Sequence, residues 1–153
     1  MPQDPKPADK HFEIGPSQAE GGAEVHKPAH IQAQAEAQDK AQARLQAEDH
    51  YYAALDHVGE GRDQQAVDEY HQALAADATF VDALHGLSRA LQNLNRLDEA
   101  IAVANQLSAL DPDDVLAHTS LSILYQKKGM IPEAEAEANK ARILGWKQQL
   151  KGK

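Results

Sequence analysis

The sequence predicts an all-α protein in which three helix-turn-helix hairpins stack as a solenoid. Its 153 residues are enough for one domain. Alanine and glutamine are abundant and aromatic residues make up only 5%, which favours helices packed through small side chains. The amphipathic stretch RLDEAIAVANQLSALDPDD, residues 96–114, also recurs in related form before and after itself. Repetition at a fixed period is typical of solenoids.

The repeat has a period of 34 residues and predicts three units, 47–80, 81–114 and 115–148. Related runs in the three units are GRDQQAVDEYHQALAADAT, NRLDEAIAVANQLSALDPD and GMIPEAEAEANKARILGWK. The register continues from one unit to the next without a gap. Each unit is therefore expected to be one hairpin that buries a face on its neighbour.

Each unit contains a helix breaker followed by a small residue in the next helix. The breakers tolerate positive φ and suit a helix end: Gly61, Asn95 and Gly129. Five residues later comes an alanine in every unit: Ala66, Ala100 and Ala134. A large side chain there would keep the two helices of a hairpin apart.

The middle unit carries the most complete set of signature residues: Leu84, Leu87, Ser88, Leu91, Ala100, Ala104 and Pro112. The first unit has at these positions His50, Ala53, Ala54, His57, Ala66, Tyr70, Ala73 and Ala78. The third has His118, Leu121, Ser122, Tyr125, Ala134, Ala138, Ala141 and Trp146. This pattern resembles the tetratricopeptide repeat family over about two thirds of the chain. The resemblance implies a right-handed superhelix with a concave groove.

The resemblance also implies that a partner peptide or helix lies in this groove, which the first helices line. The implied lining residues are Tyr51, Leu55, Val58, His85, Arg89, Gln92, Asn93, Thr119, Ile123, Gln126 and Lys127. A well-known variant of the family grips a terminal carboxylate with lysine and asparagine, where this chain has Tyr51 and Leu55. The lining therefore suits an apolar helix or strand with some negative charge, not a chaperone tail.

The segments that flank the repeats give further expectations. Residues 31–46 predict a helical extension, either a solvated helix or a lever or coiled contact with a partner. Gly145 is expected to end the last helix, and residues 149–153 to form a basic tail. Trp146 and Leu150 then either fold back as a minimal cap or join a patch that contacts another subunit, which can be a second copy of the same protein. The residues of that patch are Ile143, Leu144, Trp146 and Leu150.

Residues 1–30 contain five of the seven prolines and predict a flexible arm. Phe12, Ile14 and Val25 are its isolated apolar residues, and they are candidate anchors of a short binding motif. The alternative is an inert tail. The arm has no apolar signal region, and the chain lacks a long apolar stretch, so we expect a cytoplasmic protein.

Charge and residue types argue against other functions. The net charge is −9, and residues 47–146 hold 17 acids against seven bases, which disfavours nucleic acid and acidic membranes as partners. The chain has no cysteine, and its eight histidines lack metal-ligand spacing, since His50 and His57 are about 10 Å apart along a helix. We therefore expect no metal, no cofactor and no catalysis.

These observations predict a protein-interaction module that binds a partner peptide or helix in its groove and helps to assemble a complex. The alternative is a non-catalytic accessory subunit that is held in a larger enzyme complex by its arm and its uncapped C-terminal end. A large stoichiometric interface would favour the second function.

Overall fold

The computed structural model describes residues 28–152, and all regular structure within them is helical. The helices are α2 (Ala29–Gly59), α3 (Asp63–Ala76), α4 (Val81–Asn93), α5 (Leu97–Leu110), α6 (Val115–Lys127) and α7 (Ile131–Lys151). The chain divides into two compact units, Met1–Asp39 and Lys40–Lys153, and the second contains α2 from Lys40 onward and all of α3 to α7. The arm residues Phe12, Ile14 and Val25 lie outside the described residues.

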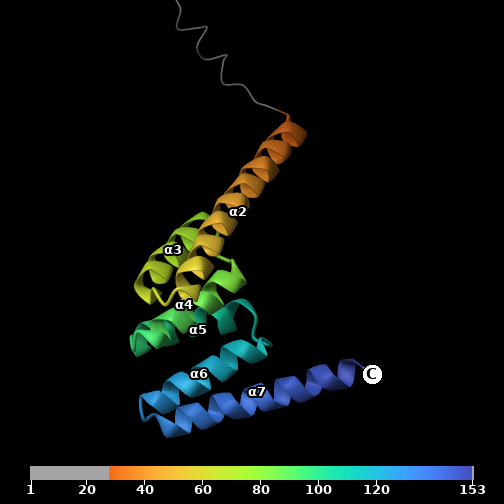
Figure 1. Ribbon diagram of the computed structural model, residues 1–153. Helices are drawn as coiled ribbons and strands as arrows, with labels where there is room; N and C mark the ends of the chain where they lie inside the picture. Colours follow the sequence, from red (N-terminus) through yellow and green to blue (C-terminus); the bar gives the residue numbers. More distant parts are fainter. Residues whose placement is uncertain (1–27, 153) are drawn as a thin grey trace, which may run out of the picture. The chain divides into compact units, whose positions relative to one another are not determined.

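The hairpins pair α2 with α3, α4 with α5 and α6 with α7, and Figure 1 shows the last two pairs as successive antiparallel helices. The turn residues adopt the left-handed conformation, as predicted. Their φ angles are 74° at Gly61, 61° at Asn95 and 79° at Gly129. Between hairpins, α3 contacts α4 and α5 contacts α6, so the all-α solenoid is confirmed.

Small residues occupy the positions at which the helices of a hairpin meet. Ala66 and Ala100 are completely buried, and Ala134 is 5% exposed. The space around these contacts is filled by larger side chains that are almost completely buried: Val67, Tyr70, Leu87, Leu91, Leu107, Leu121 and Leu124. The burial of the three alanines confirms that they allow the helices to approach each other closely.

Tyr70 is the one aromatic side chain among these core residues, and it depends on Gly86. The Tyr70 ring from α3 lies against the backbone of α4, where a Cβ on Gly86 would overlap the ring. The residues one and two repeats after Tyr70 are Ala104 and Ala138. The first two hairpins therefore fit together because the large Tyr70 side chain of one occupies the space that Gly86 of the other leaves free.

The first and third hairpins share a histidine–glutamate pair. His50 Nδ1 lies 2.7 Å from Glu69 Oε2, and His118 Nδ1 lies 2.6 Å from Glu137 Oε2. The middle hairpin has buried Leu84 at the histidine position and Val103 at the glutamate position. The same place between the two helices of a hairpin is thus filled by a polar pair twice and by an apolar pair once.

His118 has acceptors on both sides, since Nε2 also lies 2.8 Å from the carbonyl oxygen of Pro112. Burial lowers the pKa of His118, but the hydrogen bonds to Glu137 and Pro112, with the charge of Glu137, raise it above its ordinary value of 6.5. Only the protonated ring can donate to both partners at once.

The C-terminal end differs from the sequence prediction. Gly145 does not end the last helix, and residues 149–151 are not a tail, because α7 continues to Lys151. In the preceding repeats the equivalent residues are Asp77 and Asp111, whose Oδ1 atoms accept from the backbone N–H two residues later and so form a turn. Gly145 has no side chain to form this turn, so the helix continues.

The interpretation of Trp146 and Leu150 as a folded-back cap is also wrong. Trp146 is 66% exposed and Leu150 is 59% exposed. At the other end, α2 runs from Ala29 to Gly59, so residues 31–46 belong to the helix that opens the first hairpin.

Replacing Gly86 by alanine should destabilise the protein, although alanine is normally the better helix residue by about 1 kcal/mol. The added methyl group meets the Tyr70 ring, and such overpacking costs about 1–3 kcal/mol. Gly145→Ala is the matched control, since Gly145 lies within α7 with open space around its Cα. Urea unfolding should show a lower free energy of unfolding for Gly86→Ala and a higher one for Gly145→Ala. An equal increase in both variants would contradict the packing of Tyr70 against Gly86.

The His118 interactions should make stability depend on pH. Because the folded-state pKa is raised, their stabilisation is complete below the unfolded pKa of about 6.5 and is lost as pH rises through the folded value. The melting temperature should fall by a few degrees between about pH 6 and about pH 9.

The double variant His118→Leu, Glu137→Val is the control for this prediction. It introduces the residue types that the middle hairpin has at the same positions, Leu84 and Val103. The difference in pH dependence between the natural protein and this variant measures the pair. Identical pH profiles would show that His118 does not contribute.

Candidate functional site

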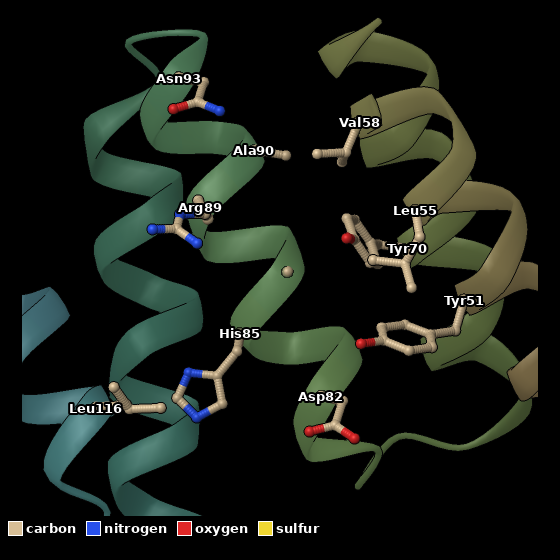
Figure 2. A pocket seen from close by; sticks show the side chains of 11 residues that line it. Tyr51, Leu55, Val58, Tyr70, Asp82, His85, Arg89, Ala90, Asn93 and Leu116 are labelled. Atoms are coloured by element: carbon tan, nitrogen blue, oxygen red, sulfur yellow. The ribbon is translucent and has the colours of Figure 1, made fainter. Parts of the chain in front are cut away.

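A pocket of about 300 Å³ opens between the first and second hairpins. Most of its lining comes from α2 and α4, the first helices of these hairpins, and Figure 2 shows the two walls facing each other. The lining residues are Tyr51, Leu55, Val58, Tyr70, Asp82, His85, Gly86, Arg89, Ala90, Asn93 and Leu116. We call this pocket the groove site.

Six residues of the predicted groove lie together in this site: Tyr51, Leu55, Val58, His85, Arg89 and Asn93. The other five do not line it: Gln92, Thr119, Ile123, Gln126 and Lys127. Gln126 lines a different pocket, with Ile131 and Glu135, and the Thr119 hydroxyl donates to the carbonyl of Val115 at 2.8 Å. The third hairpin reaches the groove site only through Leu116, so the site is shorter than the predicted groove.

Sequence reasoning did not place five lining residues here: Tyr70, Asp82, Gly86, Ala90 and Leu116. Tyr70 belongs to the second helix of its hairpin and stands at a signature position, so its side chain was expected in the core. Its ring reaches the groove site because Gly86 leaves room for it. The signal in the sequence was a tyrosine at a position where the next two repeats have alanine.

The wall formed by α2 is apolar. Tyr51, Leu55 and Val58 share one face of the helix because they are spaced by four and three residues. Leu55 is 40% exposed and Val58 is 37% exposed, so both have surface available to a ligand. The Tyr51 ring is held by aromatic neighbours, with centroid distances of 5.1 Å to Phe80 and 6.1 Å to Tyr70.

The wall formed by α4 is mainly polar, and two of its four polar side chains, His85 and Asn93, already have partners. His85 Nε2 lies 2.8 Å from Asp114 Oδ2, and Asp114 also caps the N-terminus of α6. Asn93 Nδ2 donates to Asp63 Oδ1 at 3.5 Å. Arg89 is exposed and makes no hydrogen bond or ion pair with any side chain of residues 28–152. Its guanidinium is therefore available to a carboxylate.

The two tyrosines of the groove site remain protonated at neutral pH. Burial raises the pKa of Tyr51, as do the nearby Asp82 carboxylate and Tyr52. Burial also raises the pKa of Tyr70, and Tyr51 adds to this while Arg89 opposes it. Both phenols are thus hydroxyl groups that can donate a hydrogen bond.

The predicted C-terminal patch is only partly assembled. Ile143, Trp146 and Leu150 are exposed on α7, whereas Leu144 is half-buried and lines a pocket with Pro112 and His118. Among residues 28–152, no three histidine, aspartate or glutamate side chains gather as a metal site requires. None of the helices in this range is both long and apolar enough to cross a bilayer.

Comparisons with known proteins agree with the sequence pattern. A family model described as tetratricopeptide repeat matches residues 57–122. This match includes the end of α2, all of α3, the whole second hairpin and α6 as far as residue 122. The predicted resemblance to this family is thereby confirmed. No curated protein sequence matches the chain significantly.

Solved structures match the fold. A crystal structure of MamA matches with a TM-score of 0.66 and 24% identity, over 67% of this chain and 60% of that one. The second TPR of Spaghetti (RPAP3), bound to HSP90 peptide SRMEEVD, matches with a TM-score of 0.64 and 20% identity, over 67% of this chain and 95% of that one. The Yersinia enterocolitica type III secretion translocator chaperone SycD matches with a TM-score of 0.61 and 20% identity, over 64% of this chain and 73% of that one. The chain spans less than two thirds of MamA, and these identities show a shared fold.

Proposed function

We propose that this chain is a protein-interaction module that binds a partner peptide or helix in the groove site. The observation that carries the proposal is the combination of an exposed apolar wall with the unpaired Arg89. An apolar side chain of the ligand would contact Leu55 and Val58, and a neighbouring carboxylate would bind Arg89. Binding sites commonly combine an apolar surface with a few polar groups that fix orientation.

The groove site is preorganised for such a ligand. Phe80 and Tyr70 hold the Tyr51 ring, and Asp114 holds the His85 ring. Few side chains of the groove site would have to be ordered on binding, so most of the entropic cost would fall on the ligand. This rigidity supports a binding function, and binding of this kind requires no chemical step.

We propose that the ligand is recognised through internal side chains and not through its terminal carboxylate. The second TPR of Spaghetti was solved with the HSP90 peptide SRMEEVD. In our chain Tyr51 and Leu55 stand where the resemblance implied a lysine and an asparagine for gripping a carboxylate. Arg89 alone supplies a positive charge to the groove site, and Asp82 supplies a negative one.

The net charge supports a protein as partner. At −9 the chain as a whole repels phosphate backbones and anionic membrane surfaces. An accessory subunit embedded in a larger complex is a second candidate, because Ile143, Trp146 and Leu150 give α7 an exposed apolar surface. In that case the partner would be lost when α7 is altered and kept when the groove site is altered.

Peptides selected from a random display library should test the groove site. We expect the selected sequences to combine bulky apolar residues with an acidic residue. Arg89→Ala should weaken binding of such a peptide about tenfold by fluorescence polarisation, as expected for the loss of one charge-assisted contact. Val58→Glu should weaken it further, because it places a charge on the apolar wall.

Arg142→Ala is the matched control, since Arg142 is an exposed arginine outside the groove site whose guanidinium donates to Asn139. The Arg142→Ala variant should bind the selected peptide with the same affinity as the natural protein. Selected peptides that bind all three variants equally would place the binding surface elsewhere.

A further inference from the structure

The last helix presents an apolar stripe that nothing in the described part of the chain covers. Ile143, Trp146 and Leu150 are 52%, 66% and 59% exposed. Their spacing of three and four residues places them on one face of α7. Soluble proteins do expose single apolar residues, but three large ones along one helix face indicate a contact surface.

A row of lysines accompanies this stripe. Lys147 and Lys151 lie in the same two turns, and neither makes a hydrogen bond or ion pair with residues 28–152. After Glu137 the chain contains no acidic residue and five basic ones. We call Ile143, Trp146, Leu150, Lys147 and Lys151 the α7 face. It is a basic surface on a chain whose net charge is −9.

The first helix presents a surface of opposite charge. Leu45 and Tyr52 are 57% and 60% exposed and are one heptad apart, so they share a face of α2. Asp49 and Asp56 are exposed beside them at the same spacing. Neither aspartate pairs with another described side chain. We call Leu45, Tyr52, Asp49 and Asp56 the α2 face.

The solenoid itself shows that a helix can pack on this face. The residues one repeat after Asp49 and Asp56 are Ala83 and Ala90, both buried on α4, the helix that packs on α3. The residues two repeats after them are Ala117 and Leu124, both completely buried in the core cluster that includes α5 and α6. The α2 face is thus the equivalent surface of the first hairpin, and within residues 28–152 no other hairpin precedes it.

The surface of α7 that would simply continue the stack is less suitable. Glu135 stands at the position of Val67 and Ile101, which pack in the core at the junctions between hairpins. A carboxylate there would lie close to an aspartate of the α2 face. The α7 face, with its lysines and its large apolar side chains, has the complementary charge instead.

We propose that the α7 face of one copy docks on the α2 face of a second copy. Apolar contacts among Trp146, Leu150 and Tyr52 supply affinity, and the pairing of lysines with aspartates sets specificity. Two α7 faces would repel each other, as would two α2 faces. The contact is therefore heterologous. A pair of copies keeps one unused α7 face and one unused α2 face, so the assembly grows head to tail. Within one copy the middle hairpin separates the two faces.

Charge reversal tests the pairing in the full-length chain. One variant carries Asp49→Lys and Asp56→Lys, and the other carries Lys147→Glu and Lys151→Glu. Sedimentation equilibrium should show concentration-dependent association of the natural protein, and each variant should associate at least about tenfold more weakly. All four side chains are exposed, so circular dichroism should show unchanged helix content.

Recombining the variants distinguishes this contact from others. Mixing the two in equal amounts, or joining all four changes in one chain, should restore association because opposite charges meet again. A natural protein that stays monomeric up to roughly millimolar concentration would overturn the proposal. The proposal would also be overturned if either double variant associated as strongly as the natural protein. An α7–α7 contact, for example, would leave association of the Asp49→Lys, Asp56→Lys variant unchanged. Failure of the quadruple variant to recover association would overturn it as well.

Trp146 provides a local readout, because it is the only tryptophan in the chain. Its 66% exposure predicts long-wavelength emission and strong iodide quenching in dilute solution. As concentration rises, the emission should shift to shorter wavelength and quenching should fall, and the Asp49→Lys, Asp56→Lys variant should lack this change. Association without any change at Trp146 would exclude the α7 face from the contact.

Discussion

The close approach of paired helices at buried alanines is the constraint on which the rest of the structure depends. Ala54, Ala66 and Ala100 have no exposed surface, and the small side chain of alanine lets paired helices approach closely. An alanine contributes little hydrophobic energy of its own, and the larger side chains nearby supply most of it. The alanines instead fix the spacing at which Leu87, Leu91 and their equivalents can interlock.

Most of the fold could be predicted from the sequence, because the 34-residue period repeats local signals that act independently. Gly61, Asn95 and Gly129 set the turns by their tolerance of positive φ, which is a property of the residue and not of its surroundings. The end of α7 was mispredicted for a related reason. Glycine ends a helix only if the chain can turn there, and the aspartate that helps to make this turn in the earlier repeats is missing at position 145.

The site was predicted less completely, since its limits depend on contacts between hairpins. Helical phase correctly brought Tyr51, Leu55 and Arg89 together, because residues on one face of a helix remain neighbours in any packing. It could not show that the third hairpin contributes only Leu116 to the groove site. It also could not place the Tyr70 ring in the site, because that ring comes from a second helix and fits only where Gly86 has no side chain. A pairing of this kind is visible only once both helices are placed.

The fit of Tyr70 against Gly86 means that the hairpins are not interchangeable units, although their sequences share a period. The first hairpin can be followed only by one that lacks a side chain at this place, and the third hairpin has Ser120 there. Deleting the middle hairpin, or duplicating the first, would bring the tyrosine against a side chain it cannot accommodate. The order of the repeats is therefore encoded in their side chains as well as in the covalent chain.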